Sequence, residues 1–395
     1  MTAIPFVPPS RTLMGPGPSD VPERVLQAMA RPTIGHLDPA FIALMDEVRD
    51  LLRLAFRTGN PLTMPVSGPG TAGMESTVVN LVEPGDTVVA CVNGVFGGRL
   101  RDMAERAGAR VVAVEDPWGR AVEPEKLAGT LDRHPEARIV AFVQAETSTG
   151  ALSDARTLAR IAHEHDAIVI VDAVTAIGGV PLETDAWELD AVYAGTQKCL
   201  SAPPGLAPIT LGERAVAKVR SRSRPVQSWF MDLNLVMAYW GTGAKRSYHH
   251  TAPVNAIYGL HEALLILAQE GLENAWARHR CNHLALRAGL EALGLRFLVP
   301  EAERLPQLNT VVVPDGVDEA RVRARLLERH GLEIGAGLGA LAGKVWRIGL
   351  MGHSSRPDNV RLCVRAIGEA LAAEGHGVDT DAALAVADEA LAQPA

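Results

Sequence analysis

Between residues 87 and 211, short apolar runs alternate with amphipathic segments, and this alternation restricts the fold more than any other feature of the chain. The runs are TVVACV (87–92), RVVAV (110–114), RIVAFVQ (138–144), AIVIVDA (167–173), DAVYAG (190–195) and LAPITL (206–211). They show no polar alternation, which is typical of strands buried on both faces. Buried strands joined by helical crossovers predict an α/β fold with a mainly parallel sheet in a large domain.

The chain before these runs is mostly helical in pattern. Apolar residues recur at helical spacing from Asp38 to Phe56, and a further helix is expected to begin near Thr71. The segment LTMPV (62–66) between them is a poor strand candidate.

The pattern changes beyond residue 255. A long helix-compatible stretch continues to residue 293, and strand-like and helical segments alternate after it. This order predicts a smaller α/β C-terminal domain whose boundary lies near Gly271. The expected division is an N-terminal arm (1–12), a large domain (13–270), and a small domain with an alanine-rich helical tail (271–395). The proline-rich arm is expected to be disordered or to pack on another subunit.

Composition excludes several classes of partner. The chain of 395 residues has 38 basic and 46 acidic side chains and a formal net charge of −8, which argues against a nucleic-acid binder. The chain contains no uninterrupted stretch of about 18 apolar residues, so no membrane span is predicted. The N-terminus does not resemble a secretory signal. Four scattered cysteines without a CxxC pair favour a reducing compartment, so we expect a cytoplasmic protein.

Two ionisable side chains follow predicted strands at the edge where ligands bind in such sheets. Lys198 follows DAVYAG and precedes a Pro/Gly-rich turn, and Asp172 ends IVIVD. A desolvated lysine has a lowered pKa and can form a Schiff base with an aldehyde, whereas a buried aspartate can keep a pyridine nitrogen protonated. The ordinary alternatives are a solvated loop lysine and an aspartate that caps a turn. Because parallel strands end at one edge, the two side chains can converge.

The stretch SGPGTAG (67–73) formally contains GxGxxG at Gly68, Gly70 and Gly73. A dinucleotide site would need a clear strand before it and an acidic residue about 20 positions further on, and position 93 is asparagine. The other functional interpretation is a glycine-rich helix start, at which Gly70 and Thr71 contact a phosphate. An ordinary capped helix explains the pattern equally well.

Three further side chains are candidates. Arg347, in the strand-like segment KVWRIGLMG, would bind a carboxylate through its planar fork or form an inter-domain salt bridge. Phe96, between glycines after the first strand, would stack on an aromatic cofactor or belong to the core. Thr147 follows another strand end and would reach a cofactor oxygen or close a turn. His279, Cys281 and His283 have no further ligand nearby, so no metal site is predicted.

Seven motifs stand in one order along the chain: SGPGTAGME, NGVFGGR, ETSTG, VDAVTAIGG, GTQKCLSAPPG, YHHTAP and RIGLMG. Together they resemble the class V aminotransferases of the pyridoxal-phosphate fold type I superfamily, most of all the alanine–glyoxylate (serine–pyruvate) group. The resemblance covers about residues 13 to 370 and is most specific in GTQK, APPG and YHHT. It implies a homodimeric enzyme that uses pyridoxal 5′-phosphate to move an amino group from alanine or serine to glyoxylate or another small 2-oxo acid.

The resemblance also implies roles around the cofactor ring. Lys198 would form the internal aldimine of a ping-pong reaction, and Asp172 would pair with the pyridine nitrogen. Val174 and Phe96 would cover the two faces of the ring, although mammalian members usually carry Trp at the second position. Thr147 would hydrogen-bond the phenolic oxygen. Loss of Lys198 should therefore remove turnover.

Other residues are implied to hold the phosphate. Gln197, Gly70 and Thr71 would bind it within one subunit. Tyr248 and Thr251 would reach the phosphate of the neighbouring subunit, so that a dimer completes each site. Thr71 stands where mammalian members carry His, and Pro69 replaces a common serine.

The resemblance implies fewer residue roles for substrate recognition than for cofactor binding. Arg347 would bind the substrate α-carboxylate. His36 follows a glycine expected near the substrate, and it would either tune the amino donor or cap a turn. Relatives that act on ureidoglycine or pyridoxamine, and a lyase or desulfurase that uses the same cofactor, are the alternative functions. A nicotinamide dehydrogenase is a more distant one.

Overall fold

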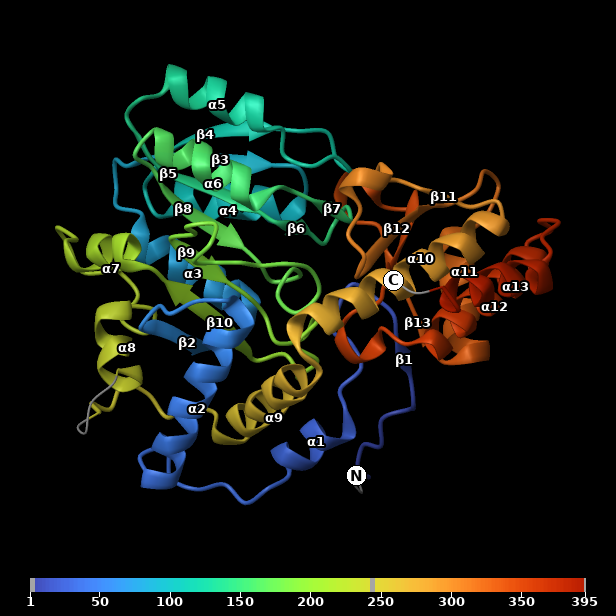
Figure 1. The fold of residues 1–395 in the computed structure, drawn as a ribbon, viewed down its shortest axis with the longest axis horizontal. Coiled ribbons are helices and arrows are strands. Elements are labelled where there is room, and N and C mark those ends of the chain that lie inside the picture. Colours follow the sequence, from blue (N-terminus) through green and yellow to red (C-terminus); the bar gives the residue numbers. More distant parts are fainter. Residues whose placement is uncertain (1–3, 242–245, 394–395) are drawn as a thin grey trace.

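The six apolar runs and residues 62–67 form one seven-stranded sheet in the order β2-β10-β9-β8-β5-β3-β4 (Figure 1). The computed structural model describes residues 4–241 and 246–393. The strands of this sheet are β2 (Leu62–Ser67), β3 (Thr87–Val92), β4 (Arg110–Glu115), β5 (Ala137–Val143), β8 (Ile168–Asp172), β9 (Ala191–Tyr193) and β10 (Leu206–Leu211). Five of them, from β4 to β9, pair in parallel, and β10 is antiparallel to both neighbours. The expected mainly parallel α/β sheet is confirmed.

Two expectations about strands were wrong. LTMPV is a strand, because β2 pairs with β10 over its whole length and its Pro65 lies opposite Pro208, so that both missing N–H groups fall at one position of the ladder. β4 was expected to be buried on both faces, but only Val114 is buried in it. β4 is an edge strand that pairs only with β3, whereas β2, at the other edge, is buried.

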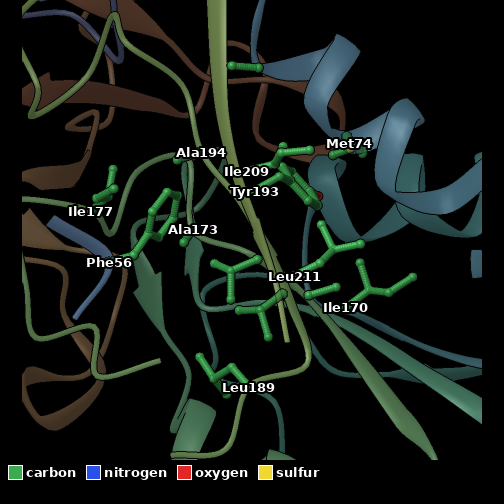
Figure 2. Close-up of a cluster of buried hydrophobic side chains, with 14 of the residues drawn as sticks. Phe56, Met74, Ile170, Ala173, Ile177, Leu189, Tyr193, Ala194, Ile209 and Leu211 are labelled. Atoms are coloured by element: carbon green, nitrogen blue, oxygen red, sulfur yellow. The ribbon is translucent and has the colours of Figure 1, made fainter. Parts of the chain in front are cut away.

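Helices cover the sheet and bury its apolar side chains. Those of the larger lobe are α1 (Glu23–Met29), α2 (Pro39–Phe56), α3 (Gly70–Leu81), α4 (Val95–Arg106), α5 (Pro124–Arg133), α6 (Ala155–Glu164), α7 (Glu213–Arg220), α8 (Leu233–Trp240) and α9 (Val254–Glu270). α3 and α4 pack directly on strands, and α1 and α2 pack on α9. Figure 2 shows part of this core, in which Met74 of α3, Ile170 of β8, Tyr193 of β9 and Ile209 of β10 gather beside one another.

The second lobe lies to the right in Figure 1 and has its own core. Its antiparallel sheet has the order β11-β12-β15-β14, in which the strands are β11 (Arg296–Phe297), β12 (Leu308–Val312), β14 (Gly335–Ala336) and β15 (Val345–Gly349). Its helices are α10 (Leu272–Ala292), α11 (Glu319–His330), α12 (Pro357–Ala373) and α13 (Thr380–Leu391). The long helical stretch is thus two helices, since Gly271 breaks it with a positive φ of 83°. The alanine-rich tail packs as α13 on α10.

The start of the chain belongs spatially to the second lobe. β1 (Thr12–Leu13) pairs in parallel with β13 (Leu332–Glu333), and Met14 is buried in the second core. The expected boundary between arm and large domain, after residue 12, therefore falls inside β1. Residues 4–10 are exposed, and residues 1–3 of the expected arm lie outside the described chain. A short hairpin of β6 (Ala145–Glu146) and β7 (Ala151–Leu152) follows β5.

Among the residues that the structure describes, none of the helices is both long enough and apolar enough to cross a lipid bilayer.

Candidate active site

Lys198 lies between β9 and β10, close to the carboxyl end of the parallel strands. Its side chain is only 7% exposed, and its ammonium donates a hydrogen bond to the carbonyl oxygen of Pro16. Burial, together with the positive charge of Arg347, lowers the pKa of Lys198 from 10.5 to about 8. The neutral, nucleophilic form of this amine is therefore far more populated near neutral pH than in an ordinary lysine.

Asp172 ends β8, the strand next to β9. Its carboxylate is 3% exposed and accepts hydrogen bonds from the backbone N–H of Val174 (2.9 Å, to Oδ1) and from the hydroxyl of Tyr193 (2.8 Å, to Oδ2). Burial raises the pKa of Asp172 from 3.8 to about 7, and the charge of Lys198 acts in the opposite direction. The structure brings these two predicted residues to one site, where their charges lie close enough to shift each other's pKa.

The raised pKa of Asp172 makes a prediction about stability. Between about pH 4 and pH 7 the folded protein retains this proton while the unfolded chain releases it, so the free energy of unfolding falls as pH rises through this range. Asp172→Asn cannot titrate. Measured by thermal unfolding of ligand-free protein, the melting temperature of the variant relative to the parent should rise steadily from pH 5 to pH 7. A difference that does not change with pH would contradict the raised pKa.

Arg347 reaches the same site from β15 of the second lobe. It is 6% exposed, and its Nε and Nη1 donate to the carbonyl oxygens of Ala336 (2.7 Å) and Thr147 (3.2 Å). These partners carry no charge, and none of the carboxylates in the described residues forms an ion pair with Arg347. Burial lowers the pKa of Arg347 to about 10. The inter-domain salt bridge that the sequence left open is not what holds this arginine.

Gly70 and Thr71 begin α3 beside the loop that carries Lys198. A Cβ atom on Gly70 would lie 3.3 Å from Val174 Cγ2 and 3.6 Å from the carbonyl oxygen of Ala194, so the helix start packs closely against the ends of β8 and β9. Pro69 precedes the helix without a side-chain cap, which leaves the first N–H groups of α3 available. Nearby, Gln197 Oε1 is buried and has no hydrogen-bond partner.

Phe96 and Thr147 lie next to this group. Phe96, half-buried at the start of α4, has the guanidinium of Arg99 5.0 Å from its ring centre, and Arg99 Nη1 donates to Thr71 Oγ1 (3.1 Å). Thr147 is buried, and its hydroxyl is hydrogen-bonded to that of Thr175. Arg99 thus adds a cation beside Thr71 and the start of α3.

His36 and Tyr248 belong to a second group of side chains, between α8 and the end of β2. The Tyr239 hydroxyl donates to the carbonyl of His36 (3.1 Å) and lies 3.1 Å from its Nδ1, while the rings of His36 and Tyr248 are 5.3 Å apart. Tyr248 is 62% exposed and Thr251 is exposed. In the described part of the chain, no hydrogen bond joins either of them to Lys198 or Asp172. Their implied role toward a second subunit stays a prediction.

The histidines that the sequence set aside have structural partners. His279 Nε2 accepts the backbone N–H of Gly352 (2.9 Å), and His283 Nδ1 lies 2.6 Å from Asn309 Oδ1. All four cysteines are unpaired. Cys199 is buried, and its burial raises the pKa of the thiol to about 12.

Sequence reasoning missed four polar residues that shape the site. Tyr193 holds Asp172, Arg99 contacts Thr71 and Phe96, and Ser19 contacts the backbone at Lys198. Glu146, fully buried, accepts the N–H groups of Phe96 and Gly97 (3.1 and 3.2 Å) and so fixes the start of α4. The spacing of Phe96 and Arg99 on one helix face was a usable signal. The other contacts join distant segments and had none.

A buried amine, a buried acid and a buried arginine at the carboxyl edge of a parallel sheet define an α/β enzyme. The profile of the family described as "Aminotransferase class-V" matches residues 12–358. The chain therefore belongs to the class V aminotransferases, as its motifs predicted, and is an aminotransferase.

Individual relatives agree with this family. The chain is 38% identical to the (S)-ureidoglycine–glyoxylate transaminase of Bacillus subtilis, covering 96% of this chain and 95% of that protein. It is 39% identical to an alanine–glyoxylate aminotransferase of Drosophila melanogaster, covering 95% and 96%. The crystal structure of an alanine–glyoxylate aminotransferase from Nostoc sp. matches with a TM-score of 0.92 at 48% identity, covering 94% of this chain and 98% of that one. These matches also confirm the fold class that the sequence predicted.

Proposed function

We propose that this aminotransferase uses pyridoxal 5′-phosphate to transfer an amino group from alanine or serine to glyoxylate or another small 2-oxo acid. The observation that carries the proposal is the convergence of Lys198, Asp172 and Arg347, three buried ionisable groups that do not neutralise one another as hydrogen-bonded ion pairs within the described residues. Relatives named for alanine–glyoxylate transfer support the choice of substrates.

The residues present fit this cofactor. The uncapped start of α3 at Gly70 and Thr71 offers N–H donors beside the loop of Lys198, and Arg99 adds positive charge that suits a phosphate. The side-chain NH2 group of Gln197 would be a further donor. Asp172 supplies the acid that a pyridine nitrogen requires. Val174 and Phe96 are only half-buried, so both have surface left for a flat ring.

When bound, pyridoxal phosphate supplies an aldehyde and an electron-withdrawing ring for chemistry at the carbon that bears the amino group. Asp172 would hold a proton at the ring nitrogen. Arg347 would bind the α-carboxylate through the part of its fork that the carbonyls of Ala336 and Thr147 leave free. Lys198, with a pKa near 8, is suited both to accept the proton from the donor's Cα and to return it as general acid.

The same lysine serves both halves of the proposed reaction. The donor would leave its amino group with the cofactor and depart as a 2-oxo acid before the acceptor enters, and Lys198 would repeat its proton transfers in reverse order for the acceptor. Arg347 binds a carboxylate in each half. One buried site can therefore accept two chemically similar substrates in turn, which is the ping-pong order that we propose.

Other donors and reactions are distinguished by particular residues. Ureidoglycine is the nearest rival donor, because a relative of similar identity is named for it. His36, placed with Tyr239 and Tyr248, is the side chain that we propose to tune the donor. Pyridoxamine as substrate would not need a phosphate site at Gly70 and Thr71. A desulfurase would need a reactive thiol, and the buried Cys199, with a raised pKa, is unsuited to that role.

We also propose that the chain acts as a homodimer. The exposed Tyr248 and Thr251 support this, because a tyrosine that is 62% exposed beside a histidine cluster is available to a second subunit. In a dimer, these two residues would reach the neighbouring phosphate.

The visible absorbance of the protein tests the proposed function. Protein loaded with pyridoxal phosphate should absorb visible light, alanine or serine should bleach it, and glyoxylate should restore it. A panel that includes ureidoglycine and pyridoxamine identifies the preferred donor from the bleaching rates. Protein that stays colourless after loading would contradict the cofactor, and colour that no amino acid bleaches would contradict transamination.

A further inference from the structure

One short segment near the N-terminus touches both lobes and the candidate active site. Residues 12–20, here called the linking segment, begin in β1 beside β13 and end before α1. Figure 1 shows this part of the chain rising from the N-terminus along the second lobe before it turns to α1. Its inner turn is held by a hydrogen bond from the backbone N–H of Leu13 to Asp20 Oδ1 (2.9 Å).

Ser19 binds the backbone on both sides of Lys198, at the carbonyl groups of the peptides before and after it. Its N–H donates to the carbonyl oxygen of Gln197 (2.9 Å), and its hydroxyl donates to the carbonyl oxygen of Lys198 (2.8 Å). Ser19 is 2% exposed, so water cannot readily replace these bonds. A single residue therefore fixes two consecutive carbonyl groups at the candidate catalytic lysine.

The same segment limits where the amine of Lys198 can lie. The carbonyl of Pro16 accepts a hydrogen bond from Nζ. A Cβ atom on Gly17 would lie 2.6 Å from Nζ and 2.7 Å from Cδ, and the φ of Gly17 is +103°, which favours glycine. The backbone of the linking segment thus forms one wall of the space that holds the lysine side chain.

The other end of the linking segment is bonded to the strand that carries Arg347. The N–H of Gly349, two residues after Arg347 in β15, donates to the carbonyl oxygen of Met14 (2.7 Å). Met14 is fully buried in the core of the second lobe. The lysine of one lobe and the arginine of the other are therefore attached to the same few residues.

We propose that Ser19 is a positioning residue for Lys198, and that the linking segment sets the place of its amine relative to Arg347. The inference deepens the proposed function, on which it rests, since it concerns the lysine that would move the proton. Ser19 contacts only the backbone of Gln197 and Lys198 through these bonds, so it acts through the lysine. Without its hydroxyl bond, the lysine gains freedom to leave its desolvated position, and its pKa returns toward the ordinary value.

The test compares Ser19→Ala with Ser354→Ala. Ser354 is fully buried, and its hydroxyl accepts the N–H of Asp20 (2.8 Å), so the control loses one buried hydroxyl bond to the same segment without touching Lys198. The readout is the pH dependence of reductive methylation at Lys198 in the full chain after release of any bound cofactor, followed by mass spectrometry of the peptide. Melting temperatures establish that both variants are folded.

In the parent protein, methylation should rise with a midpoint near pH 8. Ser19→Ala should raise this midpoint by about half a unit to one unit, the shift that corresponds to one hydrogen bond. Ser354→Ala should leave it unchanged, and Ser19→Thr, which keeps a hydroxyl, should restore it. An unchanged midpoint in Ser19→Ala, or equal shifts in both alanine variants, would overturn the proposal.

Kinetics of the loaded enzyme give a second readout. Ser19→Ala should lower kcat for alanine about 3- to 10-fold and leave KM within about twofold, because Arg347 still binds the carboxylate. An equal loss in Ser354→Ala would overturn the positioning role. Protein that methylates as expected but stays colourless with pyridoxal phosphate would contradict the proposed function and still support the placement of Lys198 by Ser19.

Discussion

Lys198→Ala is expected to lower the rate of amino transfer at least about 10³-fold. The variant loses both the nucleophilic amine and the group that moves the proton at the donor's Cα, and general acid–base catalysis alone contributes about 10²- to 10⁴-fold. The fold should persist, because alanine replaces a desolvated ammonium with an uncharged side chain. The substitution therefore leaves no unpaired buried charge at position 198. Transfer is measured with alanine and glyoxylate, together with the visible absorbance of the loaded protein.

The matched control for this variant is Lys344→Ala. Lys344 is exposed, in the second lobe, and its ammonium donates to the carbonyl of Ala340 (3.0 Å). Its loss should change neither the absorbance nor the rate. Turnover that survives in Lys198→Ala would show that another group moves the proton and would refute the role assigned to this lysine.

Arg347→Ala has the second largest expected effect. The guanidinium is buried with carbonyl partners only, so it has unsatisfied charge to offer a substrate carboxylate. Loss of one member of a buried charged pair costs about 2–5 kcal/mol, so kcat/KM for alanine and for glyoxylate should each fall about 30- to 5000-fold. Steady-state kinetics with each substrate varied in turn measure both values.

Two further variants serve as controls for Arg347→Ala. Arg347→Lys keeps a positive charge without the planar fork, so it should recover only part of the loss. Arg321→Ala removes an arginine of the same lobe whose side chain is 64% exposed, and it should have no effect on kcat/KM. If Arg347→Ala changed kcat/KM for neither substrate, the carboxylate would have to bind elsewhere.

Much of the fold followed from local patterns in the sequence. The strand from 206 to 211 was located to the residue, and those ending at Asp172 and Tyr193 to within a few residues, because apolar runs without polar alternation form buried strands. Once the strand ends were known, Lys198 and Asp172 could be placed at one edge of the sheet. The likeness of seven ordered motifs then identified the family that the profile match confirms.

The two wrong expectations about strands have causes that depend on the whole sheet and not on neighbouring residues. LTMPV was a poor strand candidate, yet its Pro65 lies opposite another proline of β10, a pairing that only the register reveals. β4 was expected to be buried because its residues are apolar, but it lies at an edge of the sheet and only its Val114 is buried. Sequence spacing carries no information about which strand becomes the edge.

The sequence by itself determined six of the seven strands of the large sheet, the helix starts near Asp38 and Thr71, and which ionisable residues follow strand ends, because these depend on side-chain periodicity and on neighbouring residues. Only the tertiary structure decided which groups hold those residues in place. Ser19 and Lys198 are 179 positions apart, and Thr147 and Arg347 are 200 apart. Such contacts, and the desolvation that shifts the pKa of Lys198 and Asp172, arise when distant segments exclude water together, so no stretch of sequence contains them.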